Sequence, residues 1–171
     1  GEDLVWVGVA QGAVAGLRYD PGREQGIKVH LAGSAGGHAW LSTMTDEQAL
    51  DKIGTQGLRA EFAMGPGAPA SIPEVLAALA DTRKRGYATM SDSYHAGMAA
   101  MAVPIFRSED NVVIGCLSIA GPGVRVTPEL MDQFHPLLRE AADEIGGASE
   151  ASFFFNRNRA VPAETETRQA G

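Results

Sequence analysis

The sequence predicts an α+β domain built on an antiparallel sheet. Short β-rich segments open the chain, helical patterns follow, and two long apolar strands joined by a hairpin precede a final helix. This order lacks the alternation of strand and helix that builds parallel sheets. At 171 residues the chain is one domain, or two at most, and its 44% hydrophobic and 20% charged residues are typical of globular proteins.

The opening segment predicts an antiparallel meander. Residues 4–10 and 13–19 are rich in strand-forming residues, and Gln11 and Gly12 between them are typical of a two-residue hairpin turn. A third strand is predicted at 27–31, where apolar and polar residues alternate.

Two helices are predicted next. The glycine-rich turn 33–37 leads into a short helix. The second helix follows Thr45, whose spacing to Gln48 is that of a capping box, and it ends at Gly54 or Gly57.

A third helix is predicted after Ser71, which has the capping-box spacing to Glu74. It ends at Gly86, directly after the basic triplet 83–85. Because cations are favoured at the negative end of a helix, we interpret this triplet as a solvated helix end rather than a nucleic-acid contact.

The later hairpin consists of two predicted strands, Met98–Phe106 and Asn111–Ala120, joined through residues 108–111. Both faces of each strand are apolar, which predicts that the hairpin is central in its sheet. One face carries only small residues near its centre, namely Ala100, Ala102, Ser118 and Ala120.

The final helix is predicted to begin after Thr127 and to continue past Pro136, which should bend it. Its buried stripe is predicted from the helical spacing of its apolar residues, Leu130, Phe134, Leu137, Leu138, Ala141 and Ile145. Residues 156–171 are polar and without periodicity, and we expect a C-terminal tail there.

Composition excludes several classes of function. With 14 basic and 21 acidic residues the net charge is −7, which argues against direct binding of nucleic acid by this chain. The single cysteine, Cys116, excludes an internal disulfide and suits a reducing compartment, so we expect a cytoplasmic location. No apolar run approaches the length of a membrane span, and the acidic N-terminus does not resemble a signal peptide.

No catalytic motif is present. The four histidines, His30, His38, His95 and His135, lack metal-binding spacings, and we interpret them as surface or satisfied core positions. Gly33-Ser34 is not a nucleophile elbow, because Ala32 breaks the pattern. Phosphate-binding and dinucleotide-binding glycine motifs are absent from the sequence, and Cys116 lies in an apolar strand where its pKa should be raised. We therefore predict a protein that is not an enzyme and has no metal or cofactor.

Two observations suggest a binding site. Small residues on one sheet face either let a helix approach closely or leave room for a ligand, and the sequence leaves both interpretations open. The turn 33–37 leads into a helix, and the free N–H groups of a helix start attract carboxylates.

Several blocks along the chain resemble the ligand-binding domain of IclR-type bacterial transcriptional regulators. The resemblance covers about residues 2–149, and the combination of an R-G-Y block with a later S-x-A-G-P block is fairly specific. The matching residues are His30 to Leu41, Lys84 to Ala88, Gly97, Ala102 to Phe106, and Leu117 to Pro122.

The resemblance implies a GAF-like (profilin-like) fold, a curved antiparallel sheet flanked by helices. It also implies a homodimer or homotetramer that senses a small organic or aromatic acid and relays its binding to a winged helix-turn-helix domain. We expect residues 1–155 to be the effector-binding domain. That DNA-binding domain is absent from this chain, so DNA would be contacted only through the missing N-terminal part. The alternative is a stand-alone GAF-type binding or dimerisation domain without a DNA partner.

Pocket positions carry over from the family only in part. The anion-binding turn maps to Ser34, Ala35, Gly36 and Gly37, and Ser118 keeps a hydroxyl group that is common in the family. Departures are Met90 for an acidic residue, Ala100 for cysteine, Ala120 for serine, and His38 for a basic residue. We therefore expect a larger and less polar pocket, with the carboxylate of the effector at the turn. Its apolar or aromatic body should lie against Met90, Met98, Ala100 and Ala120.

Overall fold

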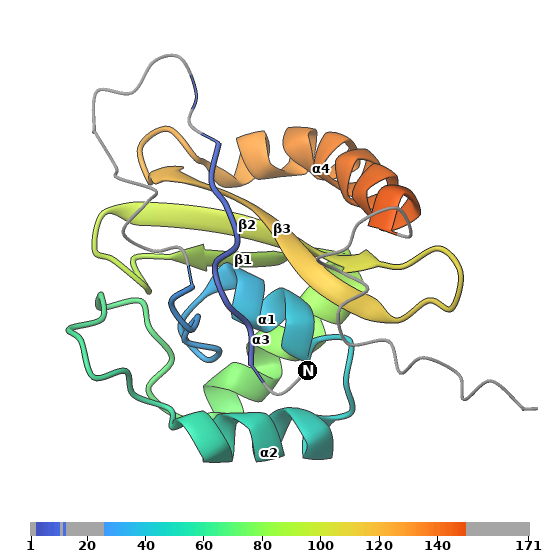
Figure 1. Ribbon diagram of the computed structural model, residues 1–171. Coiled ribbons are helices and arrows are strands. Elements are labelled where there is room, and N and C mark those ends of the chain that lie inside the picture. Colours follow the sequence, from blue (N-terminus) through green and yellow to red (C-terminus); the bar gives the residue numbers. More distant parts are fainter. Residues whose placement is uncertain (1–2, 11, 13–25, 150–171) are drawn as a thin grey trace, which may run out of the picture.

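The structure, a computed structural model, describes residues 3–10, 12 and 26–149, and it confirms the α+β class with an antiparallel sheet (Figure 1). The elements are α1 (Ala35–Leu41), α2 (Asp46–Gln56), α3 (Ile72–Arg85), β1 (Ala88–Ser91), β2 (Met98–Phe106), β3 (Val113–Pro122) and α4 (Pro128–Ala148). The predicted C-terminal tail, residues 156–171, lies outside the described residues.

The described sheet has the order β1-β2-β3, and both pairs are antiparallel. The prediction that the whole hairpin is central is therefore wrong for β3, which lies at an edge of the described sheet. β1 was not predicted at all. It has only four residues, Ala-Thr-Met-Ser, and pairing with β2 rather than a local β-rich pattern makes it a strand.

The opening meander is much reduced in the described residues. Leu4 and Trp6 run antiparallel to residues 26–29, joined by three backbone hydrogen bonds and one isolated bridge, Val5 with Lys28. The predicted strands at 4–10 and 27–31 are thus a short pairing rather than members of the main sheet. The strand predicted at 13–19 lies outside the described residues.

The predicted ends of α2 and α3 are confirmed, whereas α1 begins and ends three residues earlier than the predicted His38–Met44. Thr45 and Gln48 form the expected capping box of α2, and Gly57 follows its last residue with a φ of +93°. Ser71 caps α3, which ends before Gly86 at a φ of +87°. These caps depend on residues three or four positions apart, so local sequence determines them.

The helices form layers on both sides of the sheet. In Figure 1, α1 lies against one face and α4 against the other, while α2 and α3 lie beyond α1. On the α1 side, Ala35 and Ala39 pack against Ala88 and Ala102. On the α4 side the core includes Met101, Val103, Met131, Leu138 and Ala142. A third cluster joins α1 to α2 and α3, through Leu41, Ala49, Ile53, Val75 and Leu79.

The buried stripe of α4 agrees with its prediction only in part. Leu138 is buried as predicted, but the other buried residues, Met131, Ala142 and Gly146, were not predicted. Of the other predicted residues, Leu130, Phe134, Ala141 and Ile145 are half-buried, and Leu137 is 60% exposed. A helix turns about 100° per residue, so Leu137 lies beside the stripe that Leu138 centres. Adding it to the stripe made the predicted face too wide.

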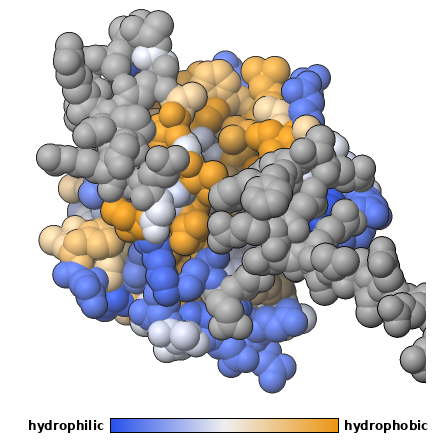
Figure 2. Space-filling model, viewed as in Figure 1, coloured by the Kyte–Doolittle hydropathy of each residue, from blue (hydrophilic) through white to orange (hydrophobic). Residues whose placement is uncertain are grey.

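Hydrophobic side chains gather in the middle of the face in Figure 2, where the opening segment crosses the sheet in Figure 1. Val5, Val7 and Val9 alternate along this segment, and each is between 39% and 48% exposed. Among the described helices, none is long and apolar enough to span a membrane.

Candidate functional site

Two hydrogen bonds to Ser34 hold the turn before α1 in place. The Ser34 hydroxyl accepts a hydrogen bond from the Gly37 N–H at 3.0 Å, and the Ser34 carbonyl accepts one from the His38 N–H at 3.0 Å. Ala35 and Gly36 stand in the first turn, where N–H groups have no partner within the helix. These two amides are the ones that a ligand could use.

The predicted sheet residues share one face, as strand alternation required. Register places Met90 opposite Ala100, and Ala100 opposite Ala120, so these three form a row across β1, β2 and β3. Ser118 lies opposite Ala102, two residues along β3 from Ala120, and Met98 is the first residue of β2. The row lies on the side of the sheet that α1 covers.

Burial divides this face into two parts. Ala88 and Ala102 are fully buried under α1, so there the small residues let the helix approach closely. Ala100, Met90 and Ser118 are only half-buried, and Ala120 is exposed. Close packing is therefore shown at one end of the face, and a ligand role for the other end stays a prediction.

Hydrogen bonds join the loop between α2 and α3 to the segment that follows β1. The Gly65 N–H donates to the Ser93 carbonyl at 2.7 Å, and the Gly67 N–H donates to the Asp92 carbonyl at 2.8 Å. The buried Ser93 hydroxyl donates to the Gly33 carbonyl at 2.8 Å, which ties the turn to the segment after β1. Residues 64–70 of this loop, Met-Gly-Pro-Gly-Ala-Pro-Ala, have no helical or strand periodicity in the sequence. Its closely spaced glycines were the available signal, because a Cβ at either would clash with Asp92 or Ser91.

Two histidines are buried beside the turn. His38 is fully buried, and its Nε2–H donates to the Ala32 carbonyl at 2.9 Å. His30 is 5% exposed, and the backbone of Gly57 and Arg59 lies beside its ring. Burial lowers the pKa of both imidazoles, so both are neutral near pH 7.

A cavity of about 530 Å³ opens beside this loop. We call it the vestibule. Backbone groups and the Arg59 side chain make much of its surface polar, although most of the residues that line it are apolar: Arg59, Ala60, Phe62, Ala63, Met64, Gly65, Pro66, Ala68 and Ala70. Its volume is in the range of small-molecule sites. None of the predicted ligand residues lines it, although Met64 also packs over Gly33, next to the predicted turn.

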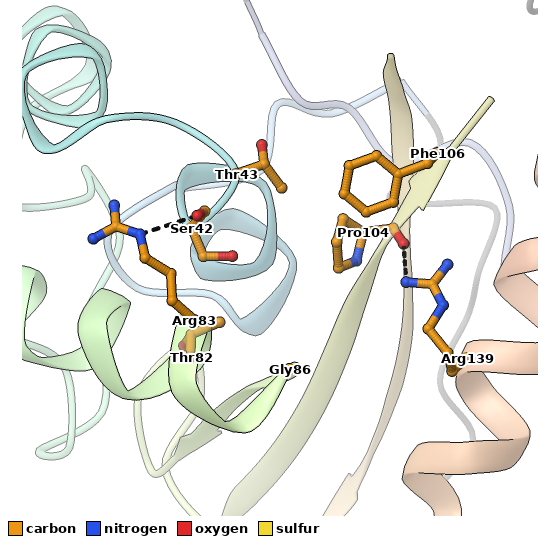
Figure 3. A pocket seen from close by; sticks show the side chains of 8 residues that line it. All are labelled: Ser42, Thr43, Thr82, Arg83, Gly86, Pro104, Phe106 and Arg139. Carbon is orange, nitrogen blue, oxygen red and sulfur yellow. Dashed lines mark hydrogen bonds between the residues drawn. The ribbon is translucent and has the colours of Figure 1, made fainter. Parts of the chain in front are cut away.

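A second cavity, of about 290 Å³, lies where β2 extends beyond β1 (Figure 3). Two arginines line it, from α3 and α4, and both guanidinium groups already form hydrogen bonds. Arg83 donates to the Ser42 and Met44 carbonyls and pairs with Asp46, while Arg139 donates to the Pro104 carbonyl and pairs with Asp143. These arginines stabilise the ends of helices and the free edge of β2, which favours a structural role for this corner.

No group of three or more His, Cys, Asp or Glu side chains in the described residues could hold a metal ion.

Cys116 lies on the α1 face of β3, against the alanine cluster. Burial raises the pKa of its thiol to about 12, which confirms the expected direction. Because the thiolate is the reactive form, we expect iodoacetamide to alkylate the folded chain at pH 8 at least about 100-fold more slowly than the chain unfolded in guanidinium. The unfolded chain is the matched control, since it has the same single thiol. Equal rates in both states would contradict the raised pKa of the Cys116 thiol.

Comparison with known proteins agrees with this fold. Residues 22–146 match the family described as bacterial transcriptional regulator IclR C-terminal. The transcriptional repressor IclR of Escherichia coli is 30% identical over 120 residues, which are 70% of this chain and 42% of the repressor. The repressor AllR of Salmonella typhimurium is 28% identical over 123 residues, 72% of this chain and 44% of AllR. The chain thus spans less than half the length of these two curated relatives.

Solved structures show the same architecture. A putative IclR-type regulator from Silicibacter is 25% identical with a TM-score of 0.69, over 86% of this chain and 57% of that one. Another is the inducer-binding domain of PobR from Acinetobacter, solved as a double mutant in complex with 3-hydroxybenzoic acid. It is 24% identical with a TM-score of 0.67, over 80% of this chain and 77% of the PobR domain. The profile match covers most of the chain, and this chain belongs to the family of C-terminal, effector-binding domains of IclR-type bacterial transcriptional regulators.

Proposed function

We propose that this domain binds a small carboxylic acid with an apolar or aromatic body, and that binding is relayed to a DNA-binding domain. The observation that carries the proposal is the position of the Ser34–Gly37 turn on the same side of the sheet as the row Met90, Ala100 and Ala120. Hydrogen-bond donors and an apolar surface thus lie on one side of the sheet, an arrangement that suits an amphipathic acid.

The chemistry follows from the residues present. The N–H groups of Ala35 and Gly36 would donate to the carboxylate, and the Ser118 hydroxyl would bind a second polar atom. With only seven residues α1 has a weak dipole, so direct hydrogen bonds rather than the dipole would hold the anion. Met90 and Met98 are flexible and apolar, which suits a ring or a branched chain.

In this proposal the domain senses and does not catalyse. Its relatives are named as repressors, and the proposal extends that role to a regulator that works as a homodimer or homotetramer in the cytoplasm. The DNA would be contacted by a separate winged helix-turn-helix domain, because this chain carries a net charge of −7.

Isothermal titration calorimetry tests the ligand class. We expect 3-hydroxybenzoate, the acid in the PobR structure, to bind more tightly than glyoxylate, because the ring covers the apolar row and a two-carbon acid does not. Replacing Ser118 with alanine should weaken binding about two- to tenfold, the worth of one hydrogen bond.

The matched control is Ser108→Ala, which removes an exposed hydroxyl in the β2–β3 loop and should leave the affinity unchanged. Tight binding of glyoxylate together with no binding of aromatic acids would overturn the proposal.

A further inference from the structure

The His38 imidazole is fully buried in α1, the helix that covers one face of the sheet (Figure 1). Its Nε2 lies 2.9 Å from the Ala32 carbonyl, and because a carbonyl only accepts, Nε2 carries the hydrogen. The other ring nitrogen, Nδ1, is also buried and has no hydrogen-bond partner among the described residues. This position therefore suits a neutral ring, since a second hydrogen on Nδ1 would find no acceptor.

The hydrogen bond from His38 to Ala32 joins the start of α1 to the chain that enters it. The start of the helix depends on such contacts, because α1 has only seven residues and two of them, Gly36 and Gly37, are poor helix formers. The Ser93 hydroxyl, which donates to the Gly33 carbonyl at 2.8 Å, is a second contact of this kind.

Among the described residues, no charged side chain acts on the His38 ring. Burial lowers the pKa of His38, and only the hydrogen bond to the Ala32 carbonyl opposes this shift. The strands β1, β2 and β3 pack against α1, and their single ionisable residue, Cys116, stays neutral because its pKa is raised. His30, which precedes the turn, is neutral near pH 7 as well.

The neighbouring helices carry their charges elsewhere. In α3, which packs against α1, the charged residues are all exposed, and they are Glu74, Asp81, Arg83, Lys84 and Arg85. In α2, which shares an apolar cluster with α1, the charged residues are Asp46, Glu47, Asp51 and Lys52. None of these side chains changes the proton affinity of His38, so an imidazolium at this position would be buried without a counter-charge.

We propose that His38 is an acid switch, which holds the start of α1 closed while its ring is neutral and opens it when the ring is protonated. The imidazolium moves to water, because in the closed position both its charge and its Nδ1–H would lack a partner. Opening separates His38 from Ala32 and releases the turn Ser34–Gly37. The switch goes beyond the proposed function and does not depend on it.

The direction of the pH dependence follows from the two states. In the open state the ring is in water and titrates near the ordinary pKa of about 6.5. In the closed state burial lowers the pKa of His38, so the closed state binds fewer protons. The stability of the closed state is therefore complete above about pH 6.5 and decreases as the pH falls below that value.

Amide hydrogen exchange, followed by NMR between pH 6.5 and pH 5, tests the switch. Each rate is divided into the rate of an unfolded peptide at the same pH, which gives a protection factor free of the direct effect of pH. The Gly37 and His38 amides both donate to Ser34 in the closed turn, and we expect their protection factors to fall about threefold or more.

The reference is the Ala49 amide, which donates to the Thr45 carbonyl at the start of α2 and should keep its protection. Unchanged protection of Gly37 and His38 would overturn the switch. An equal loss at Ala49 would also overturn it, because acid would then unfold the domain as a whole.

His38→Gln tests which group senses the acid. The glutamine side chain also ends in an N–H donor but does not titrate in this range, so protection of the α1 amides should become independent of pH. The matched controls are His30→Gln, at the other buried imidazole, and His95→Gln, on the exposed turn after β1. Both should keep the acid response. A response that persists in His38→Gln, or disappears in His30→Gln, would overturn the assignment to His38.

A measurement on the unmutated chain tests the switch even if His38→Gln does not fold. The ring ¹⁵N signals of His38 should show the Nε2–H form at pH 7 and change to those of an imidazolium over the same pH range in which the α1 amides lose protection. A His38 ring that becomes protonated while the Gly37 and His38 amides stay protected would overturn the proposal, because the closed position would then hold the charge.

Discussion

Replacing Gly37 with alanine is expected to lower the free energy of unfolding by about 3 kcal/mol, at the upper end of overpacking effects. The added Cβ would lie 2.5 Å from Leu31 Cα and still closer to the Leu31 carbonyl oxygen. These are backbone atoms, so no side-chain rotation can relieve the clash. Leu31 cannot retreat either, because it is buried against α2 and α3. Thermal denaturation followed by circular dichroism should show a fall in Tm of about 10 °C.

Gly54→Ala is the matched control for this substitution. Gly54 lies inside α2, and a Cβ there would meet nothing within 4 Å. Alanine is the better helix former, so this variant should gain about 0.5–1 kcal/mol in the free energy of unfolding. The same chemical change should thus have opposite effects at the two glycines. A stable Gly37→Ala would show that α1 does not approach Leu31 as closely as the structure indicates.

The contrast between these glycines bears on how much the sequence could predict. Helix boundaries at Thr45, Ser71 and Gly86 followed from capping residues a few positions apart, and the structure confirms them. The strand β1 and the edge position of β3 did not follow, because pairing between distant segments decides both. A glycine excess was visible in the sequence. Which of these glycines lets another backbone segment approach closely depends on the fold.

The candidate site divides in the same way. Alternation along β2 and β3 placed Ala100, Ser118 and Ala120 on one face, and the observed register agrees. His30 and Met64 could not be singled out, since their proximity needs the α2–α3 loop to fold back over Gly33. No periodic pattern encodes that contact.

The largest contrast between neighbouring residues is expected in α4. Leu138→Ala should lower the free energy of unfolding by about 3 kcal/mol, since it leaves a cavity beside a closely packed core. Leu138 is 6% exposed and belongs to the cluster with Met101 and Val103. Leu137→Ala should change this free energy by less than about 0.5 kcal/mol, because Leu137 is 60% exposed. Urea denaturation of both variants measures the difference.

These two variants remove the same atoms from adjacent positions of one helix, so helix propensity changes equally in both and cancels in their comparison. What remains is burial alone. The sequence pattern placed both leucines in the stripe and therefore predicts two similar losses of stability, whereas the structure predicts one large and one small. If the two losses in the free energy of unfolding differ by less than about 0.5 kcal/mol, α4 is rotated on the sheet relative to this structure. A large loss for Leu138→Ala alone would fix which face of α4 lies on β2.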